Sequence, residues 1–434
     1  MSTKSSARSI LILSLLSLCS TTYGAGFAIY EHSARGMGLG GAVIGEAADA
    51  STVADNPAAM TDLEGFSFYG GLTAIVPTTD ISIRETGRKY HMKRDAFAIP
   101  AVFATWQLSD KWWLGFGEYT EFGLGSRYHS NWDLAYSSYD TSLETFTINP
   151  TIAYKLTDDL SLALGMRIMY AAFEYHSRPL YNAPSAALSA MGVPPVLHDH
   201  FREQTFNVDG DDVGFGWNAA VRYRITDKWS WGFTYRSPTW IHIKGDIWTE
   251  SRVPSNIVPG AQRNTKGDGK ITLPQAFVTG VNYAPTKDWL FGAIVTWTQW
   301  SSYEALNINV NQPLPAFGGK TVMGGTKNYH DVFRFGIGGE WQFIDNFKWR
   351  MGFVYDMDPT AEGNADTIVP AADRFILSSG LGYTYDWLTV DLSYSFLYGT
   401  DETRTIHGAA HQALTADFSH SRAHMLALNI GAKF

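Results

Sequence analysis

The sequence predicts an all-β fold in which about fourteen antiparallel strands form a transmembrane β-barrel. Polar and apolar residues alternate in runs of about ten residues from residue 63 to residue 434, as barrel strands require. Aromatic residues make up 14% of the chain and charged residues only 17%, against about 25% in soluble domains. Because the mean hydropathy is near zero, these proportions fit a barrel with an apolar outside and a polar inside, not a bundle of membrane helices.

Pairs of alternating runs are joined by short polar turns, which is the pattern of β-hairpins. In the clearest pair, the run 213–225 turns at 226–228 into the run 229–236. The other predicted turns lie at 109–110, 157–159, 285–288, 345–346 and near 386. Runs at 66–74 and 422–434 complete the fourteen strands. We expect long outer loops at 77–96, 125–141, 177–212, 241–270, 302–331, 357–373 and 399–420.

The two faces of these runs differ in charge. One face carries aliphatic residues with Trp and Tyr near its ends, as a lipid-facing surface does. The other carries charged residues well inside the runs, among them Arg167, Arg222, Arg334, Glu340, Arg350 and Asp391. An arginine facing mid-bilayer lipid costs about 2–4 kcal/mol, so these residues should face a polar lumen. A soluble β-sandwich would alternate similarly, but it would not explain the strand lengths, the export signal or the final alternating run ending at Phe434.

Residues 1–24 have the features of a cleaved export signal. Lys4 and Arg8 precede a short apolar core at 10–18, and small residues follow, with two neighbouring positions open for cleavage. The core is shorter than the roughly 20 apolar residues of a membrane anchor, which makes an uncleaved anchor the weaker alternative. The only cysteine, Cys19, lies in this segment, so we expect no disulfide in the exported chain. Export and a barrel together predict the outer membrane of a Gram-negative cell.

Residues 25–62 do not alternate and form a separate segment before the barrel at 63–434. The segment is rich in glycine and alanine and too small to bury a core of its own. We therefore expect it to fold inside the barrel lumen as an N-terminal plug. Its acidic residues should pair with arginines of the wall; these are Glu46, Asp49, Asp55 and Asp62.

An ordered set of short motifs resembles one family. The set comprises Ala25-Gly26-Phe27 before glycine-rich sequence, Asn56-Pro57-Ala58, Phe122-Gly123-Leu124, Leu273-Pro274, 297–300, 331–334 and Asp373-Arg374-Phe375. In this order the motifs resemble the FadL-type outer-membrane transporters of long-chain fatty acids and other hydrophobic compounds (FadL/TodX, OMPP1). The resemblance covers nearly the whole exported chain, although each motif alone is unspecific.

The resemblance implies a barrel without an open water channel. A ligand would pass from an outer groove into a pocket beside the N-terminal residues, and would leave sideways through the wall into the bilayer. Ala25, Gly26, Phe27 and Ile29 would form the pocket and its N-terminal gate. Asn56, Pro57 and Ala58 would shape the plug, and Phe122, Gly123 and Leu124 would mark the inward kink that opens the wall. Gly123 has an equally good alternative as an ordinary strand glycine.

Two outer loops are unusually apolar for water-exposed segments, which predicts an entry groove. Its candidate residues are Leu180, Leu188, Met191, Val193, Val196, Leu197 and Trp248. The alternative is that these loops only pack on each other as a lid. A fatty acid also needs a basic partner for its carboxylate, and the resemblance places the family's basic residues near Arg178 and Lys327. If neither reaches the pocket, a neutral aromatic or alkane hydrocarbon becomes the better ligand.

Other functions are disfavoured by what the sequence lacks. It has no nucleophile elbow, zinc-binding helix or phosphate loop, so we expect no enzyme and neither cofactor nor metal. The net charge of −9 disfavours nucleic acid as a partner. We expect a monomer that contacts outer-membrane lipid and a hydrophobic small molecule. A general porin and a lipid-acting barrel enzyme remain as alternatives of another class.

Overall fold

The computed structural model describes residues 26–179, 185–190, 192–198, 204–251, 263–314, 320–361, 363–369, 372–408 and 411–434. The expected export signal and Ala25 lie outside these residues. The strands are β1 Phe66–Ile83, β2 Lys89–His91, β3 Phe97–Gln107, β4 Trp112–Tyr119, β5 Gly123–Arg127, β6 Asp140–Lys155, β7 Leu160–Ser177, β8 Gln204–Arg224, β9 Trp229–Arg236, β10 Thr239–Ser251, β11 Arg263–Leu273, β12 Ala276–Thr286, β13 Trp289–Thr298, β14 Ala305–Leu314, β15 Lys320–Thr326, β16 Val332–Ile344, β17 Phe347–Asp356, β18 Arg374–Tyr385, β19 Leu388–Gly399, β20 Glu402–Gly408 and β21 His411–Lys433.

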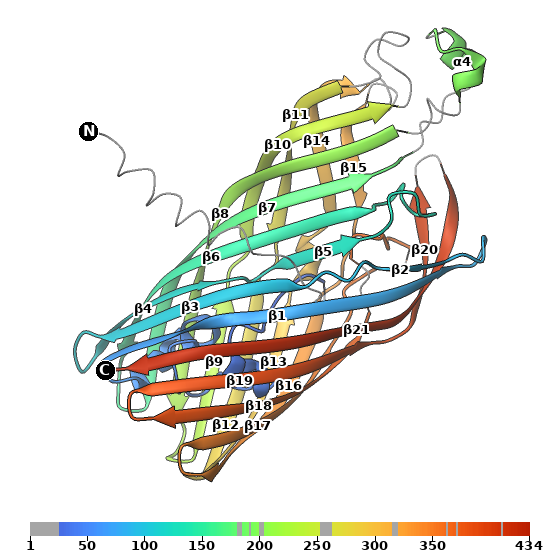
Figure 1. Ribbon diagram of the computed structural model, residues 1–434. Coiled ribbons are helices and arrows are strands. Elements are labelled where there is room, and N and C mark those ends of the chain that lie inside the picture. Colours follow the sequence, from blue (N-terminus) through green and yellow to red (C-terminus); the bar gives the residue numbers. More distant parts are fainter. Residues whose placement is uncertain are drawn as a thin grey trace, which may run out of the picture.

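Fourteen antiparallel strands, each paired with the next, close the wall and confirm the predicted barrel, whose tilted strands Figure 1 shows. Around the barrel their order is β1, β3, β4, β6, β7, β8, β9, β12, β13, β16, β17, β18, β19 and β21. The first and last strands close the ring along almost their whole length, from Ser67 opposite Lys433 to Ile83 opposite Ala416. Closure leaves no sheet edge in the bilayer, where unpaired backbone groups are costly. The six predicted hairpin turns are all present between the strands.

The remaining strands lengthen the wall at the loop end, and here the predicted loop boundaries were wrong. Strands β10 and β11 occupy most of 241–270 and pair from Thr239 opposite Leu273 to Thr249 opposite Arg263. Strands β14 and β15 fill much of 302–331, and β20 with the start of β21 fills much of 399–420. The sheet therefore continues well beyond the part whose outer face is apolar.

The two faces of the wall follow the predicted polarity. Along β7, Leu162, Leu164 and Met166 point outward and are 40–56% exposed, whereas Arg167 points inward and is 1% exposed. The same contrast recurs along β16, between outward Ile337 and inward Glu340. No helix in the described part of the chain is long and apolar enough to cross a membrane.

The N-terminal segment lies between opposite sides of the wall (Figure 1). Its helices are α2 Ala34–Gly38, α3 Thr52–Asp55 and the 3-10 helix η2 Pro57–Asp62. Helix α2 contacts β17, β18, β19 and β21, while η2 contacts β4, β6, β7 and β8. Glycines of the wall make this close packing feasible: a Cβ at Gly338 or Gly352 would overlap the backbone of Leu39 or Gly40.

Three short helices lie in the outer connections. They are α4 Ser185–Ala190, the 3-10 helix η3 Pro195–Leu197 and the 3-10 helix η4 Trp300–Ser302. Helix η4 turns the chain inward directly after β13, so that Trp300 is 1% exposed. This turn places an aromatic residue of the outer connections beside the N-terminal segment.

Candidate functional site

An aromatic cage encloses the side chain of Phe27. Its ring lies edge-on to Trp300 at 4.7 Å, to Tyr303 at 5.4 Å and to Phe122 at 6.1 Å, measured between ring centroids. Tyr329 completes the cage, because its ring lies edge-on to that of Tyr303 with 5.3 Å between the centroids. Edge-on contacts of this kind are favourable by about 0.5–1.5 kcal/mol per pair. Three chain segments distant in sequence thus hold the first residues of the N-terminal segment in place.

The outer half of the lumen beyond this cage is apolar. The buried cluster around Phe27 continues onto inward-facing residues of the wall, including Met169, Phe173, Ile243 and Ile271. A narrow cavity adjoins it, lined mainly by Phe173, Val208, Ile243, Ile247, Ile271, Leu306 and Ile308. Barrel interiors are usually polar, so an apolar lumen beside a buried Phe is suited to an apolar ligand.

The wall is bent inward where β4 gives way to β5. Residues 120–122 leave the sheet between Tyr119 and Gly123, and Phe122 instead bridges to Ala28 of the N-terminal segment. The Gly123 N–H donates to the Phe27 carbonyl at 2.9 Å, and the Ile29 N–H donates to the Glu121 carbonyl at 2.8 Å. The predicted kink at 122–124 and the N-terminal residues 27–29 are therefore directly hydrogen-bonded to each other.

A gap in strand pairing accompanies the kink. Strand β3 pairs with β4 from Val102 to Gln107, whereas β5 pairs with β6. Within 97–127, all of which is described, no register joins β3 to β5. A cleft of about 340 Å³ lies there, lined by residues that include Phe97, Gly125, Ser126, Asp140 and Glu144. The backbone hydrogen-bonding of the barrel is thus interrupted next to the Phe27 cage.

A buried ion pair fixes the kink from inside. Glu121 is 4% and Arg167 is 1% exposed, and the Arg167 guanidinium donates to both carboxylate oxygens, at 2.8 and 2.5 Å. Arg167 also donates to the Ser237 carbonyl at 2.8 Å. The alternation of the sequence predicts that Arg167 faces the lumen, whereas nothing in an isolated Thr-Glu-Phe tripeptide shows that Glu121 turns inward.

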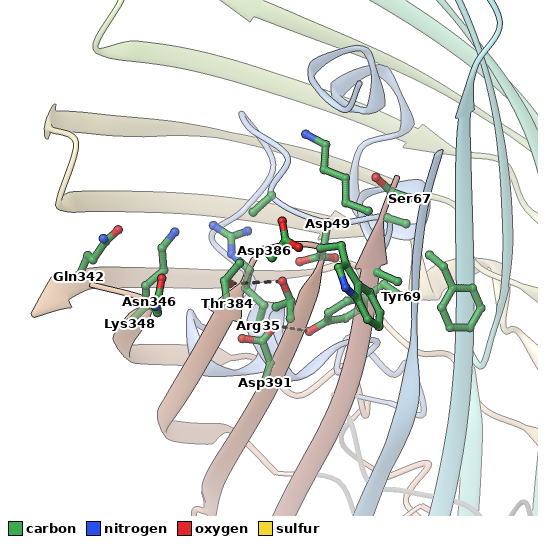
Figure 2. Close-up of a pocket in the computed structure, with 18 of the residues that line it drawn as sticks. Arg35, Asp49, Ser67, Tyr69, Gln342, Asn346, Lys348, Thr384, Asp386 and Asp391 are labelled. Carbon is green, nitrogen blue, oxygen red and sulfur yellow. Dashed lines mark hydrogen bonds between the residues drawn. The ribbon is translucent and has the colours of Figure 1, made fainter. Parts of the chain in front are cut away.

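The opposite end of the lumen is polar and charged. A cavity of about 360 Å³ lies there, and its lining includes Arg35, Asp49, Tyr69, Lys348 and Asp391 (Figure 2). Asp391 accepts a hydrogen bond from the Tyr69 hydroxyl at 2.8 Å. The cavity is unsuited to an apolar ligand. Its charges serve instead to hold the N-terminal segment against the wall.

Charged and polar contacts attach the N-terminal segment to two sides of the wall. On one side, Arg35 pairs with Glu340 at 3.3 Å, and Glu340 also pairs with Arg350 at 2.7 Å. On the other, Asp62 pairs with Arg222 at 2.8 Å. Of the predicted acidic partners, Asp62 thus contacts wall arginines, whereas Glu46 pairs with Arg35 of its own segment at 2.7 Å.

Asn56, Pro57 and Ala58 form a fully buried turn in this segment. The Asn56 side chain donates to the Ile44 carbonyl at 2.6 Å and to the Val221 carbonyl of β8 at 3.1 Å. Its oxygen accepts from the Ala58 N–H and so caps η2. Pro57 then begins the 3-10 helix, where its missing N–H costs nothing.

The two candidate carboxylate anchors lie in different surroundings. Lys327, in the connection after β15, is 7% exposed and forms an ion pair with Asp366. Burial and the Asp366 carboxylate act in opposite directions on Lys327, and the net effect is a raised pKa. Arg178 places its guanidinium over the Tyr139 ring, 5.7 Å from the centroid.

The predicted entry groove is only partly within the described residues. Leu180 and Met191 lie outside them. Leu188 and Val193 are buried, Val196 is 82% exposed and Leu197 is half-buried. Trp248 belongs to β10 and lies edge-on to His176 at 6.1 Å. The loop residues and the aromatic cage are thus separate features in the described part of the chain.

Comparison with known proteins identifies the family. A model of the family described as outer membrane protein transport protein (OMPP1/FadL/TodX) matches residues 15–434. The chain belongs to this family. The long-chain fatty acid transport protein of Escherichia coli K12 is 26% identical over 420 residues, covering 90% of this chain and 92% of that protein. Outer membrane protein P1 of Haemophilus influenzae is 27% identical over 469 residues, covering 98% of this chain and 99% of the relative.

Solved structures of FadL-type proteins share the fold. A Pseudomonas aeruginosa FadL homologue superposes with a TM-score of 0.79 at 20% identity, covering 94% of this chain and all of the other. The Pseudomonas putida toluene transporter TodX superposes with a TM-score of 0.70 at 17% identity, covering 95% and 99%. This FadL-type protein is therefore a closed β-barrel of the outer membrane, in a family of transport proteins.

Proposed function

We propose that this FadL-type protein carries hydrophobic molecules, foremost long-chain fatty acids, across the outer membrane and releases them sideways through the barrel wall. The observation that carries the proposal is the adjacency of three features. An apolar lumenal pocket ends at the Phe27 cage, the cage contacts the kink at Phe122, and the kink lies beside the unpaired edges of β3 and β5.

The route that follows begins among the apolar outer loops and leads into the pocket above Phe27. Phe27 and Ile29 hydrogen-bond through their backbones to Gly123 and Glu121. A ligand that displaces Phe27 therefore also loosens the kink, which is the step that opens the wall. Release into the bilayer spares an apolar molecule contact with the polar cavity near Arg35 and Asp391.

In this proposal residues 25–62 are a plug that stays in place while only its first residues move. The contacts of Asp62 with Arg222 and of Arg35 with Glu340 support a fixed plug. A general porin would need an open aqueous path, which a segment packed between opposite walls obstructs. Enzymatic activity forms no part of the proposal, because the family is one of transport proteins.

The alternative substrate is a neutral hydrocarbon. The fatty acid transporter of Escherichia coli and the toluene transporter of Pseudomonas putida both resemble this chain. One observation favours the neutral ligand: the ammonium group of Lys327 already has the Asp366 carboxylate as its partner.

Uptake by whole cells tests the function. Cells that lack their own fatty acid transporter and express this chain should take up labelled oleate faster than cells with an empty vector. Labelled toluene is measured in parallel. Toluene uptake without oleate uptake would retain the transport route and change the substrate class, whereas uptake of neither would contradict the proposed function.

A further inference from the structure

The basic group near the candidate pocket, the ammonium of Lys327, is already paired with a carboxylate of the chain itself, that of Asp366. Asp366 Oδ2 accepts from the Lys327 ammonium, while Asp366 Oδ1 accepts from the N–H groups of Ile368 at 2.8 Å and Val369 at 3.3 Å. Both charged side chains are largely buried, at 8% and 16% exposed. Because its second oxygen is held by two backbone groups, Asp366 is fixed in place independently of Lys327.

This ion pair lies beside the Phe27 cage. Ile368 and Val369 belong to the same buried cluster as Phe27, so the turn that Asp366 caps forms part of the apolar lining. Tyr303, whose ring contacts Phe27, feels both charges of the pair, and burial raises its pKa to about 12. A polar ligand end that reached Lys327 would therefore meet Asp366 as well.

Three further phenols lie close enough to the ion pair to feel its charge. Tyr175 of β7 and Tyr329 feel the Asp366 charge, as does Tyr128 directly after β5. Burial raises the pKa of Tyr128 and of Tyr329 above the ordinary value, so both remain neutral at physiological pH. Asp358, which also acts on Tyr329, is paired with Arg404 at 2.7 Å. The Lys327–Asp366 pair itself thus presents no net positive charge to an incoming anion.

We infer that Asp366 determines which charge state of a ligand the pocket accepts, and that it selects an uncharged polar end over a carboxylate anion. A second carboxylate beside Lys327 would share one ammonium with Asp366 in a site that excludes most water, where like charges disfavour each other. Hydrocarbons, long-chain alcohols and protonated fatty acids escape this repulsion. The inference rests on the proposed function and specifies the substrate class of its pocket.

The test compares two ligands with the same chain and different charge. Binding of oleate and of oleyl alcohol to the purified full-length barrel is measured at a pH well above the pKa of oleic acid. The wild type should bind the alcohol at least about tenfold more tightly, a difference of about 1.4 kcal/mol. Lowering the pH below the pKa of oleic acid should strengthen binding of the acid and leave that of the alcohol unchanged.

Substitutions assign the preference to Asp366. Asp366→Asn keeps an oxygen for the Ile368 and Val369 amides but leaves Lys327 charged and unpaired, so oleate should gain at least about tenfold in affinity. Adding Lys327→Met should abolish that gain. Asp358→Asn is the matched control, because Asp358 caps the Thr360 N–H in the same connection and pairs with Arg404 instead; its ligand preference should equal that of the wild type.

Two results would overturn the inference in distinguishable ways. If the wild type binds oleate anion as tightly as the alcohol and Asp366→Asn changes nothing, Asp366 has no selective role, while the proposed transport function stands. If the wild type binds neither ligand and transports neither, the proposed function falls and this inference falls with it. Heat-resistant migration on gels shows that each variant retains its barrel.

Discussion

Gly26 determines how closely the N-terminus can approach Trp300. Its backbone φ is +59°, in the left-handed region, and a Cβ there would overlap the indole ring of Trp300. A side chain in this conformation costs about 1–2 kcal/mol, and the overlap adds a steric term. Glycine at this position therefore allows Phe27 to lie against Trp300, with centroids 4.7 Å apart.

Gly26→Ala should displace Phe27 from its cage and lower ligand affinity by at least about tenfold. The control is Gly41→Ala, because Gly41 has a φ of +79° and a Cβ there would meet no atom within 4 Å. Both variants place an alanine in the left-handed backbone conformation, but only Gly26→Ala also brings its Cβ into overlap with Trp300. Titration of each purified variant with a fluorescent fatty acid or alcohol measures the difference. Equal losses in the two variants would mean that strain, not contact with Trp300, determines affinity.

At this scale the sequence predicts only part of the site. Phe27 and Phe122 were identified through motif resemblance, and the structure places their rings 6.1 Å apart. Trp300 ends the motif at 297–300, which by itself indicates no role for this residue, and no sequence pattern points to Tyr303 or Asp366. These residues come from connections whose mutual approach depends on the closed barrel, and a local pattern carries no information about such contacts.

Among the elements, the outer strands show why the predicted loop boundaries were wrong. Strand β11 reads RNTKGDGKITL, with polar residues on both faces over its first part. An alternation of apolar and polar residues marks a strand only where its outer face meets lipid. Beyond the lipid boundary the outer face of the sheet meets water, and the inward positions over this part of β11 are Thr265, Gly267 and Gly269, so the hydrogen-bonded ladder persists while the alternation of apolar and polar residues disappears. The fourteen membrane strands kept that signal and were predicted correctly.

The kink between β4 and β5 depends on a buried ion pair, which makes Glu121 a test of the wall opening. Glu121→Gln would leave Arg167 buried without its counter-charge, a change that typically costs about 3–5 kcal/mol. Because the Glu121 carbonyl also accepts from Ile29, ligand should dissociate at least about tenfold faster. Stopped-flow displacement of a bound fluorescent ligand measures this rate.

The control for this element is Asp417→Asn. Asp417 pairs with Arg84 at 2.6 Å, but both side chains are well exposed, and such pairs contribute only about 0–1 kcal/mol. Ligand should therefore dissociate from Asp417→Asn at the wild-type rate. If Glu121→Gln also releases ligand at the wild-type rate, the ion pair does not hold the kink.

The first residues of the N-terminal segment form a second element with a separable role. Deleting residues 25–30 removes Phe27 and the hydrogen bonds to Glu121 and Gly123, but none of the ion pairs of Arg35 or Asp62. High-affinity binding should be lost while the barrel still migrates as a heat-resistant band. Retained affinity would show that the pocket does not need these residues.

In the whole molecule, the proposed route assigns ligand binding and closure of the lumen to different parts of the N-terminal segment. The gate at Phe27 contacts the wall at the kink, whereas Arg35 and Asp62 attach the rest of the segment to β16 and β8. The attachments are buried and hydrogen-bonded, so displacing the gate does not require breaking them. In the proposed route, this separation would allow a ligand to open the wall sideways while ions and water remain excluded.

Conductance across a planar bilayer tests that separation. The wild type and the variant lacking residues 25–30 should both show no steady large current, because α2, α3 and η2 still fill the lumen between opposite walls. A variant lacking residues 26–62 should insert as a barrel and conduct steadily, since a fourteen-stranded wall encloses a lumen that its inward side chains alone do not fill. A steady current through the short deletion would show that Phe27 and its neighbours, not the ion-paired remainder, exclude water. A closed barrel after the long deletion would mean that the outer connections seal the lumen and that the segment is no plug.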